Sequence, residues 1–243
     1  MSTSFHDLAI PERVALVREG SAHYTAQLMN IDDADFGRET LLSAWTAAEL
    51  AAHVAYNAAA LDNLMHWAHT GDKTPMYATP ETRNQEIAYG ATLPPVEIRQ
   101  LHVQTLASLD QAWDETSDQA WSNEVITAQG MTVPAAMTVW MRTREVWIHA
   151  VDLNAGASFA DIPEIILSTL VPEIAGKWRD SGLGEGLVLF NTDDDQLIEV
   201  SPGRQTTRVQ GSLAGLAQWV TGRGSAGVHT SDRGEVPEPP RWL

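Results

Sequence analysis

The sequence contains no cysteine among its 243 residues. This absence excludes disulfide bonds, a zinc site built from thiolates, and a nucleophilic thiol carried by the protein itself. A metal ion in this protein would therefore have histidine, aspartate or glutamate as its ligands. Any thiol chemistry would need a thiol supplied by another molecule.

Positive charge is also scarce, because 15 lysines and arginines stand against 32 acidic residues and the formal net charge is −17. Such a field repels nucleic-acid phosphates and anionic lipid, so we expect neither as a partner. No apolar run approaches the ~20 residues of a membrane helix. Residues 1–6 lack the basic and apolar regions of a signal peptide, so we expect a cytoplasmic protein.

Hydrophobic residues make up 44% of the chain, enough to build a core in one large domain or two small ones. Apolar residues recur at helical spacing over residues 11–29, 46–69, 95–113 and 133–153, within an expected first domain of residues 1–155. Thr46 and Glu49 have capping-box spacing, and Pro134 suits a first helical turn. Residues 124–133 predict a hairpin and residues 70–92 a long loop. This arrangement predicts a four-helix bundle.

The pattern changes near Gly156, and we expect a smaller second domain over residues 156–243. Asp161 and Glu164 have the spacing of another capping box, ahead of a helix to about Trp178. Short β-prone runs cover 186–190, 196–200 and 206–209, followed by a helix over 212–221 and an extended Pro-rich tail over 236–243. Helix, strand meander and helix predict an α+β unit, so the chain is expected to be mainly α overall.

The most informative segment is the fourth predicted helix, which is apolar nearly all round and therefore typical of a buried helix. Glu145 and His149 are four residues apart in it, so they share one face. An unpaired carboxylate on such a face is destabilising by several kcal/mol. It must be protonated, paired with a cation or bound to a metal. A glutamate and a histidine at this spacing can chelate one ion from a single helix.

His53 lies on the apolar stripe of the second predicted helix and is a third candidate ligand. We therefore predict a divalent-metal site formed by His53, Glu145 and His149. Three nitrogen and oxygen ligands with an open fourth position are typical of a catalytic zinc site. Asn57 and Asp152 are candidate hydrogen-bond partners that would orient these ligands.

The same residues also have a simpler interpretation. A histidine on an apolar stripe is usually a core residue, and Glu145 could form an ordinary buried pair with His149, Arg142 or Arg144.

The metal site also has a geometric condition. At a rise of ~1.5 Å per residue, His53 lies about 10 Å into its helix, whereas Glu145 and His149 lie roughly 18–24 Å into theirs. The helices would have to be offset by a turn or two for the ligands to meet.

The remaining histidines show no ligand spacing. His66 and His69 lie about 20 Å or more along the helix from His53, so we interpret them as surface or loop-packing residues. His6, His23, His102 and His229 have no recognisable partner in the sequence.

Arg223 follows Gly222 just past the last predicted helix and precedes Gly224. A cation at this place complements the helix dipole. A guanidinium on a glycine-flanked loop can also hold a carboxylate through two parallel hydrogen bonds. The residues alone leave both interpretations open.

Four segments resemble the mycothiol-dependent maleylpyruvate isomerases. Residues 42–57 carry His53, residues 142–153 carry Glu145 and His149, residues 211–224 carry Arg223, and residues 234–243 form the tail. The two helical segments alone are typical of the broader DinB-like metal-binding superfamily. The two C-terminal segments make the resemblance to the isomerases specific, and together the four segments extend it over essentially the whole chain.

The resemblance implies a DinB-like four-helix bundle that binds zinc through His53, Glu145 and His149. It implies a C-terminal α+β domain, similar to sterol-carrier folds, that contributes Arg223 to the active site. The implied reaction is the cis–trans isomerisation of maleylpyruvate to fumarylpyruvate in gentisate degradation, with mycothiol as the thiol cofactor.

This reaction is chemically consistent with a protein that lacks a thiol of its own. A thiolate that adds to the carbon conjugated with the ketone leaves a rotatable single bond, and elimination after rotation gives the trans isomer. A metal could lower the pKa of the thiol or polarise the substrate's oxygens, and the residues leave both open.

Two other functions also stay open: a mycothiol S-transferase on the same scaffold, and a non-catalytic ligand-binding protein with a structural metal. The sequence does not indicate an oligomeric state.

Overall fold

The computed structural model describes residues 4–242, which form two compact units. One unit is Ala9–Ala157, and the other combines residues 158–242 with residues 4–8. Residues 1–3 and Leu243 lie outside the described residues. They belong to the N-terminal segment 1–6 and to the Pro-rich tail 236–243 considered above. None of the helices described is long and apolar enough to cross a membrane.

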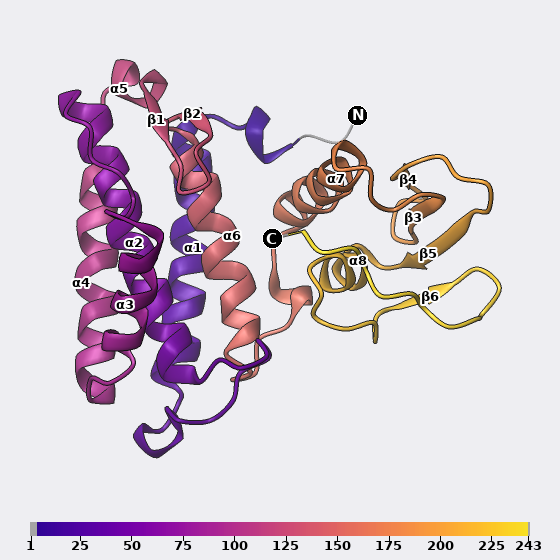
Figure 1. Ribbon diagram of the computed structural model, residues 1–243, viewed down its shortest axis with the longest axis horizontal. Coiled ribbons are helices and arrows are strands. Elements are labelled where there is room, and N and C mark those ends of the chain that lie inside the picture. Colours follow the sequence, from indigo (N-terminus) through magenta and orange to yellow (C-terminus); the bar gives the residue numbers. More distant parts are fainter. Residues whose placement is uncertain (1–3, 243) are drawn as a thin grey trace. The chain divides into compact units, whose positions relative to one another are not determined.

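The first unit is helical apart from one small hairpin (Figure 1). Its helices are α1 (Ile10–Met29), α2 (Ala47–Thr70), α3 (Pro80–Gly90), α4 (Pro95–Asp114), α5 (Asp118–Ser122) and α6 (Met137–Asp152), with a 3-10 turn at Asp33–Asp35. Helix α2 packs along α4 and also contacts α6, while α1 packs along α6. The four long helices therefore associate as the periodicity predicted, and their apolar faces meet in a common core.

Helix α2 begins where the capping box predicted. The Thr46 hydroxyl accepts a hydrogen bond from the Glu49 amide, and the Glu49 carboxylate accepts one from the Thr46 amide. Two amide groups at the helix start are satisfied in this way. The helix ends at Gly71, whose φ of 79° lies in the left-handed region that favours glycine.

The loop expected over residues 70–92 was wrong in part, because it contains helix α3. Pro80 occupies the first turn, and the Thr79 hydroxyl accepts a hydrogen bond from the Thr82 amide. Pro80 and Gly90 therefore mark the beginning and the end of a helix and are not loop residues. Gly90 lies so close to Ala52 and Tyr56 that a β-carbon there would collide with them, which allows α3 to pack against α2.

The expected start of the fourth helix was also wrong. Residues Thr132–Pro134 form strand β2, which pairs antiparallel with β1 (Glu124–Ile126), so the predicted hairpin is confirmed. Pro134 ends this strand, and the amides of Ala135 and Ala136 donate to the carbonyls of Asn123 and Trp121. Helix α6 consequently begins only at Met137.

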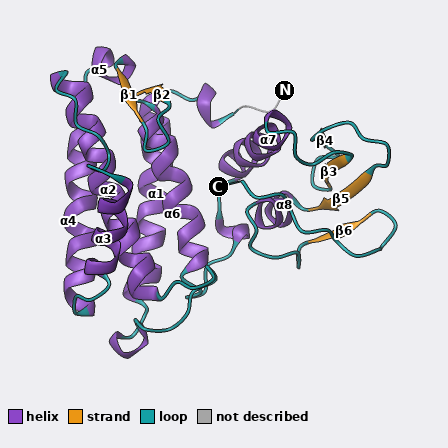
Figure 2. Ribbon diagram, viewed as in Figure 1, coloured by secondary structure: helices purple, strands orange, loops and turns teal. Residues whose placement is uncertain are grey.

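The second unit is the smaller α+β part (Figure 2). Its elements are a 3-10 turn at Phe5–Asp7, another at Phe159–Asp161, α7 (Glu164–Asp180), β3 (Leu187–Asn191), β4 (Leu197–Glu199), β5 (Thr207–Gly211), α8 (Leu213–Val220) and β6 (Val228–Thr230). A mainly α chain with a smaller α+β part was the predicted class, and it is confirmed.

The expected strand meander was wrong. The strand order is β4-β3-β5-β6, with β3 and β5 parallel, because the chain after β4 crosses to the other side of β3. The crossing is tight at Gly186, where a β-carbon would collide with the carbonyl oxygen of Gln205. Strand β6 was missed altogether.

The capping box expected at Asp161 and Glu164 was wrong as well. The Asp161 carboxylate accepts hydrogen bonds from the amide and the hydroxyl of Ser158, so it closes the preceding 3-10 turn. Helix α7 begins at Glu164 after Pro163, which makes no side-chain cap.

A fully buried arginine joins α2 to α6. The Arg142 guanidinium of α6 donates to the carbonyl oxygen of Val54 at 2.7 Å and to Oδ1 of Asn57 at 2.8 Å, both on α2. Burial lowers the pKa of Arg142 to about 10, with the carboxylate of Glu145 opposing that shift. A buried cation held by neutral oxygens depends strongly on each of them.

Replacement of Asn57 by alanine should therefore destabilise the protein. Loss of a hydrogen bond to a buried charge predicts a decrease of about 1.5–3 kcal/mol in the free energy of unfolding, measured by urea denaturation. Asn63→Ala is the matched control, since Asn63 is an exposed residue of the same helix. Equal effects of the two substitutions would contradict the role assigned to Asn57.

Candidate metal centre

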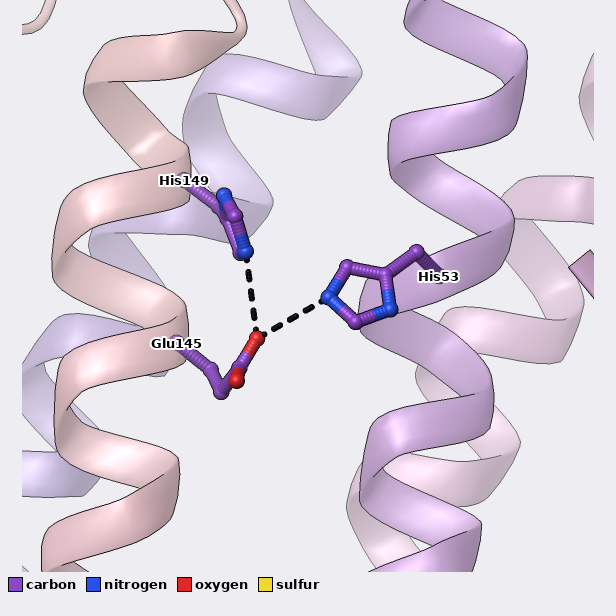
Figure 3. A group of neighbouring side chains, drawn as sticks. All are labelled: His53, Glu145 and His149. Carbon is purple, nitrogen blue, oxygen red and sulfur yellow. Dashed lines mark hydrogen bonds and ion pairs between the residues drawn. The ribbon is translucent and has the colours of Figure 1, made fainter. Parts of the chain in front are cut away.

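His53 of α2 and Glu145 and His149 of α6 converge inside the helical unit (Figure 3). Oε2 of Glu145 lies 3.1 Å from Nε2 of His53 and 3.1 Å from Nε2 of His149. One ligand atom from each of the three residues lies within 4.8 Å of the others. The three residues singled out in the sequence thus share one site.

The offset that the sequence required of the two helices is unnecessary, because α2 and α6 are antiparallel. Residue numbers rise along α6 as they fall along α2 in the paired contacts Thr138–Met65, Arg142–Asn57 and Glu145–His53. A residue early in one helix therefore meets a residue late in the other. The expectation was wrong because it measured both helices from the same end.

The carboxylate of Glu145 is ionised in this environment. Burial raises its pKa, but hydrogen bonds from His149 and His53 outweigh burial and hold the pKa of Glu145 well below its usual range. Its side chain remains 28% exposed. The ordinary pair with a histidine is present, since Glu145 contacts both His53 and His149, whereas Arg142 donates to α2.

Asp152 orients His149, as the spacing suggested. Oδ2 of the fully buried Asp152 lies 2.8 Å from Nδ1 of His149. Burial lowers the pKa of His149, but Asp152 and Glu145 together raise it to about 9. A histidine that gives Nδ1–H to a carboxylate presents Nε2 to a metal, which is the usual arrangement behind a metal-ligating imidazole.

His53 has different neighbours, and the role suggested for Asn57 was wrong. Oδ1 of Asn57 accepts from Arg142, and the group that approaches Nδ1 of His53 is Nη2 of Arg83, at 3.4 Å. The Trp45 ring packs edge-on against the imidazole at 5.4 Å between centroids. Burial lowers the pKa of His53, although Glu145 opposes this shift. Arg83 was missed because residues 70–92 were interpreted as a loop.

The donor set suits a divalent cation of the zinc class. Two imidazole nitrogens and one carboxylate oxygen are the ligands of many catalytic zinc sites. Tetrahedral bonds of about 2.0–2.1 Å place ligand atoms roughly 3.4 Å apart, close to the 3.1 Å between Glu145 and each histidine. Small side-chain movements are enough to admit an ion.

Arg223 belongs to the other compact unit, where it follows α8 on a loop between Gly222 and Gly224, whose φ angles are 76° and 101°. Its Nη1 donates to the carbonyl oxygen of Thr221 at 2.6 Å, which is the helix-end contact that a cation was expected to make. The amide of Gln218 in turn donates to the carbonyl oxygen of Arg223 at 3.0 Å, and these contacts fix the loop.

The other histidines stay apart from this cluster among the described residues. His69 contacts the Thr116 hydroxyl at 2.7 Å, in agreement with a loop-packing role. His102 is fully buried, contacts the Thr25 hydroxyl at 2.8 Å, and has its pKa lowered to about 3 by burial. It is a neutral core residue, which is the usual role of a histidine on an apolar stripe.

Fold and site together define a class: a helical bundle with an internal cluster of two histidines and one carboxylate, joined to a small α+β unit. Residues 17–154 match the family described as mycothiol maleylpyruvate isomerase N-terminal domain. This match covers more than half of the chain, and the chain belongs to that family.

Two solved structures are similar to nearly the whole chain. The crystal structure of the mycothiol-dependent maleylpyruvate isomerase is 58% identical, with a TM-score of 0.97, and the match covers 99% of this chain and 100% of that one. The crystal structure of a histidine-to-alanine mutant of the mycothiol-dependent maleylpyruvate isomerase is 57% identical, with a TM-score of 0.96 and the same coverage. No curated protein matches the chain.

The raised pKa of His149 predicts how the stability of the metal-free protein depends on pH. The folded state binds this proton more tightly than the unfolded chain, so the proton's stabilising effect is complete below about pH 6.5 and is lost as the pH rises through about 9. The loss is on the order of 3 kcal/mol, measured by urea denaturation in the presence of a chelator.

Asp152→Asn should reduce this loss, because it removes the hydrogen-bonded carboxylate that contributes most to raising the pKa of His149. The same dependence on pH in the variant and the parent protein would contradict the assignment.

Proposed function

We propose that this protein is a cis–trans isomerase that converts maleylpyruvate to fumarylpyruvate, with mycothiol as thiol cofactor and a divalent metal, zinc being the expected ion. The observation that carries the proposal is the 58% identity with the mycothiol-dependent maleylpyruvate isomerase over almost the entire chain. The reaction belongs to gentisate degradation, and we expect it to take place in the cytoplasm.

The metal ligands in this proposal are His53, Glu145 and His149. Asp152 keeps Nε2 of His149 directed at the ion, and the ionised carboxylate of Glu145 supplies the negative charge that a divalent cation needs. When bound, the cation supplies Lewis acidity for the thiol or the substrate, and mycothiol supplies the nucleophile that makes the double bond rotatable. The Glu145 side chain is partly exposed to solvent, which supports access by small molecules.

The two compact units have separate roles in the proposal, as two domains with a boundary near residue 156. The helical domain holds the metal. The α+β domain supplies Arg223, which binds a carboxylate of the substrate. The fixed loop conformation around Gly222 and Gly224 supports this role, because a guanidinium on a rigid loop loses little freedom when it grips an anion.

Turnover is the primary test. Zinc-loaded protein with mycothiol should convert maleylpyruvate, and omission of either should stop the reaction. His53→Ala should lower zinc affinity by more than about 100-fold, which exceeds the typical effect of losing an outer partner, and should abolish turnover. His66→Ala is the matched control, because His66 is an exposed histidine of the same helix. Turnover without thiol or metal would contradict the proposal.

Arg223→Ala tests the substrate-binding role. Loss of a carboxylate contact predicts at least a 100-fold decrease in kcat/KM with an unchanged zinc content, measured by steady-state kinetics and metal analysis. Arg204→Ala, an exposed arginine of the same unit, is the control. Near-normal activity of Arg223→Ala would contradict the substrate-binding role.

A further inference from the structure

Among the described residues, Arg83 is a cation at the candidate metal centre that forms no ion pair with an acidic side chain. Its Nη2 lies 3.4 Å from Nδ1 of His53, and its Nη1 lies 3.4 Å from Oδ1 of Asn84. Within residues 4–242, its side chain forms no ion pair. The chain has 32 acidic residues against 15 basic ones, so an arginine that lacks an acidic partner is notable.

Two other arginines of the same unit have acidic partners, while Arg38 and Arg142 donate to neutral oxygens. Arg18 contacts Asp110 and Asp114, and Arg99 contacts Asp33. Arg83 is half-buried, which makes an uncompensated charge more costly than it would be on the open surface. An anion from outside the chain would supply the missing partner.

The two histidines of the site differ in the group that faces the second ring nitrogen, Nδ1. A metal-ligating histidine normally donates its second ring N–H to a carboxylate, a carbonyl or water. Nδ1 of His149 has Asp152 for this purpose, but Nδ1 of His53 faces the guanidinium of Arg83. A guanidinium has no acceptor.

Metal binding therefore changes the contact between His53 and Arg83. The Arg83 contact requires Nδ1 of His53 to be the acceptor, with the ring proton on Nε2 facing Glu145. When Nε2 is the ligand atom, the ring proton moves to Nδ1, and two donors then face each other. A carboxylate placed between them would accept from both.

A cavity lies next to these residues, and neither Arg83 nor His53 is among the side chains that line it. The cavity of about 170 Å³ is lined by Trp45, Glu49, Asn84, Ile87 and Ala88. Trp45 is the residue that packs on His53, and Asn84 follows Arg83 in the chain. The Tyr77 hydroxyl also lies close to Arg83, and burial raises the pKa of Tyr77 to about 12, so it stays a neutral hydrogen-bonding group.

We propose that Arg83 is a substrate-binding residue that, together with the Nδ1–H of His53, holds a carboxylate of the small anionic substrate beside the metal centre. The proposal rests on the proposed function for the identity of that substrate. Maleylpyruvate carries two carboxylates, and Arg83 holds one of them in this proposal. Arg83 lies in the helical unit, on the element that the sequence did not predict to be a helix.

The test uses the zinc-loaded full chain and maleate, a stable cis-dicarboxylate, as the probe. Arg83→Gln should weaken maleate binding at least tenfold by isothermal titration calorimetry and raise the KM for maleylpyruvate at least tenfold, with an unchanged zinc content. Arg83→Lys should be intermediate, since lysine keeps the charge but loses the bidentate geometry. Arg18→Gln removes the same charge from a residue that contacts Asp110 and Asp114, outside the ligand cluster, and should match the parent protein.

Several outcomes would overturn the proposal. They are maleate binding and KM of Arg83→Gln equal to those of Arg18→Gln, loss of zinc from Arg83→Gln, and absence of maleate binding by the parent protein. Loss of zinc would mean that Arg83 only positions His53. If the parent protein binds maleate through Arg83 but does not turn over maleylpyruvate, the carboxylate site stands and the proposed isomerase function fails.

Discussion

The contact on which the site depends is the one between the Glu145 carboxylate and two imidazoles from opposite helices. A carboxylate in the interior of a helical bundle is destabilising unless positive charge or hydrogen-bond donors surround it. His53 and His149 supply such groups, because Nε2 of each lies 3.1 Å from Oε2 of Glu145. The same arrangement concentrates three donor atoms that a divalent cation prefers. The same three side chains therefore stabilise the carboxylate inside the bundle and supply the donor atoms of a candidate metal site.

Antiparallel packing of α2 and α6 makes this contact possible, and Arg142 holds the two helices in register. Its guanidinium reaches the carbonyl of Val54, the residue next to His53, and the side chain of Asn57 one turn further on. A buried hydrogen-bonded cation fixes relative position more sharply than apolar contacts do, because displacement by even one turn would leave it unpaired. The three candidate ligands are thus positioned by a polar contact outside their own cluster.

Periodicity and local chemistry were enough to predict the four long helices, the hairpin and the three converging residues. Thr46 and Glu49 form the capping box that their spacing indicated, and Asp152 holds His149 as its position suggested. What the sequence could not provide was direction and tertiary context. Antiparallel packing decided that His53 meets Glu145 without an offset, and Pro80 and Gly90 delimit a helix because α3 packs against α2. The consequence for function was the omission of Arg83.

We expect the two helices α2 and α6 to hold one divalent cation jointly. Anomalous X-ray diffraction from zinc-loaded crystals, recorded on the two sides of the zinc absorption edge, tests it directly. We predict a single strong peak about 2.0–2.2 Å from Nε2 of His53, Nε2 of His149 and a carboxylate oxygen of Glu145. A peak bound by other residues, or no peak at this cluster at full zinc loading, would contradict it.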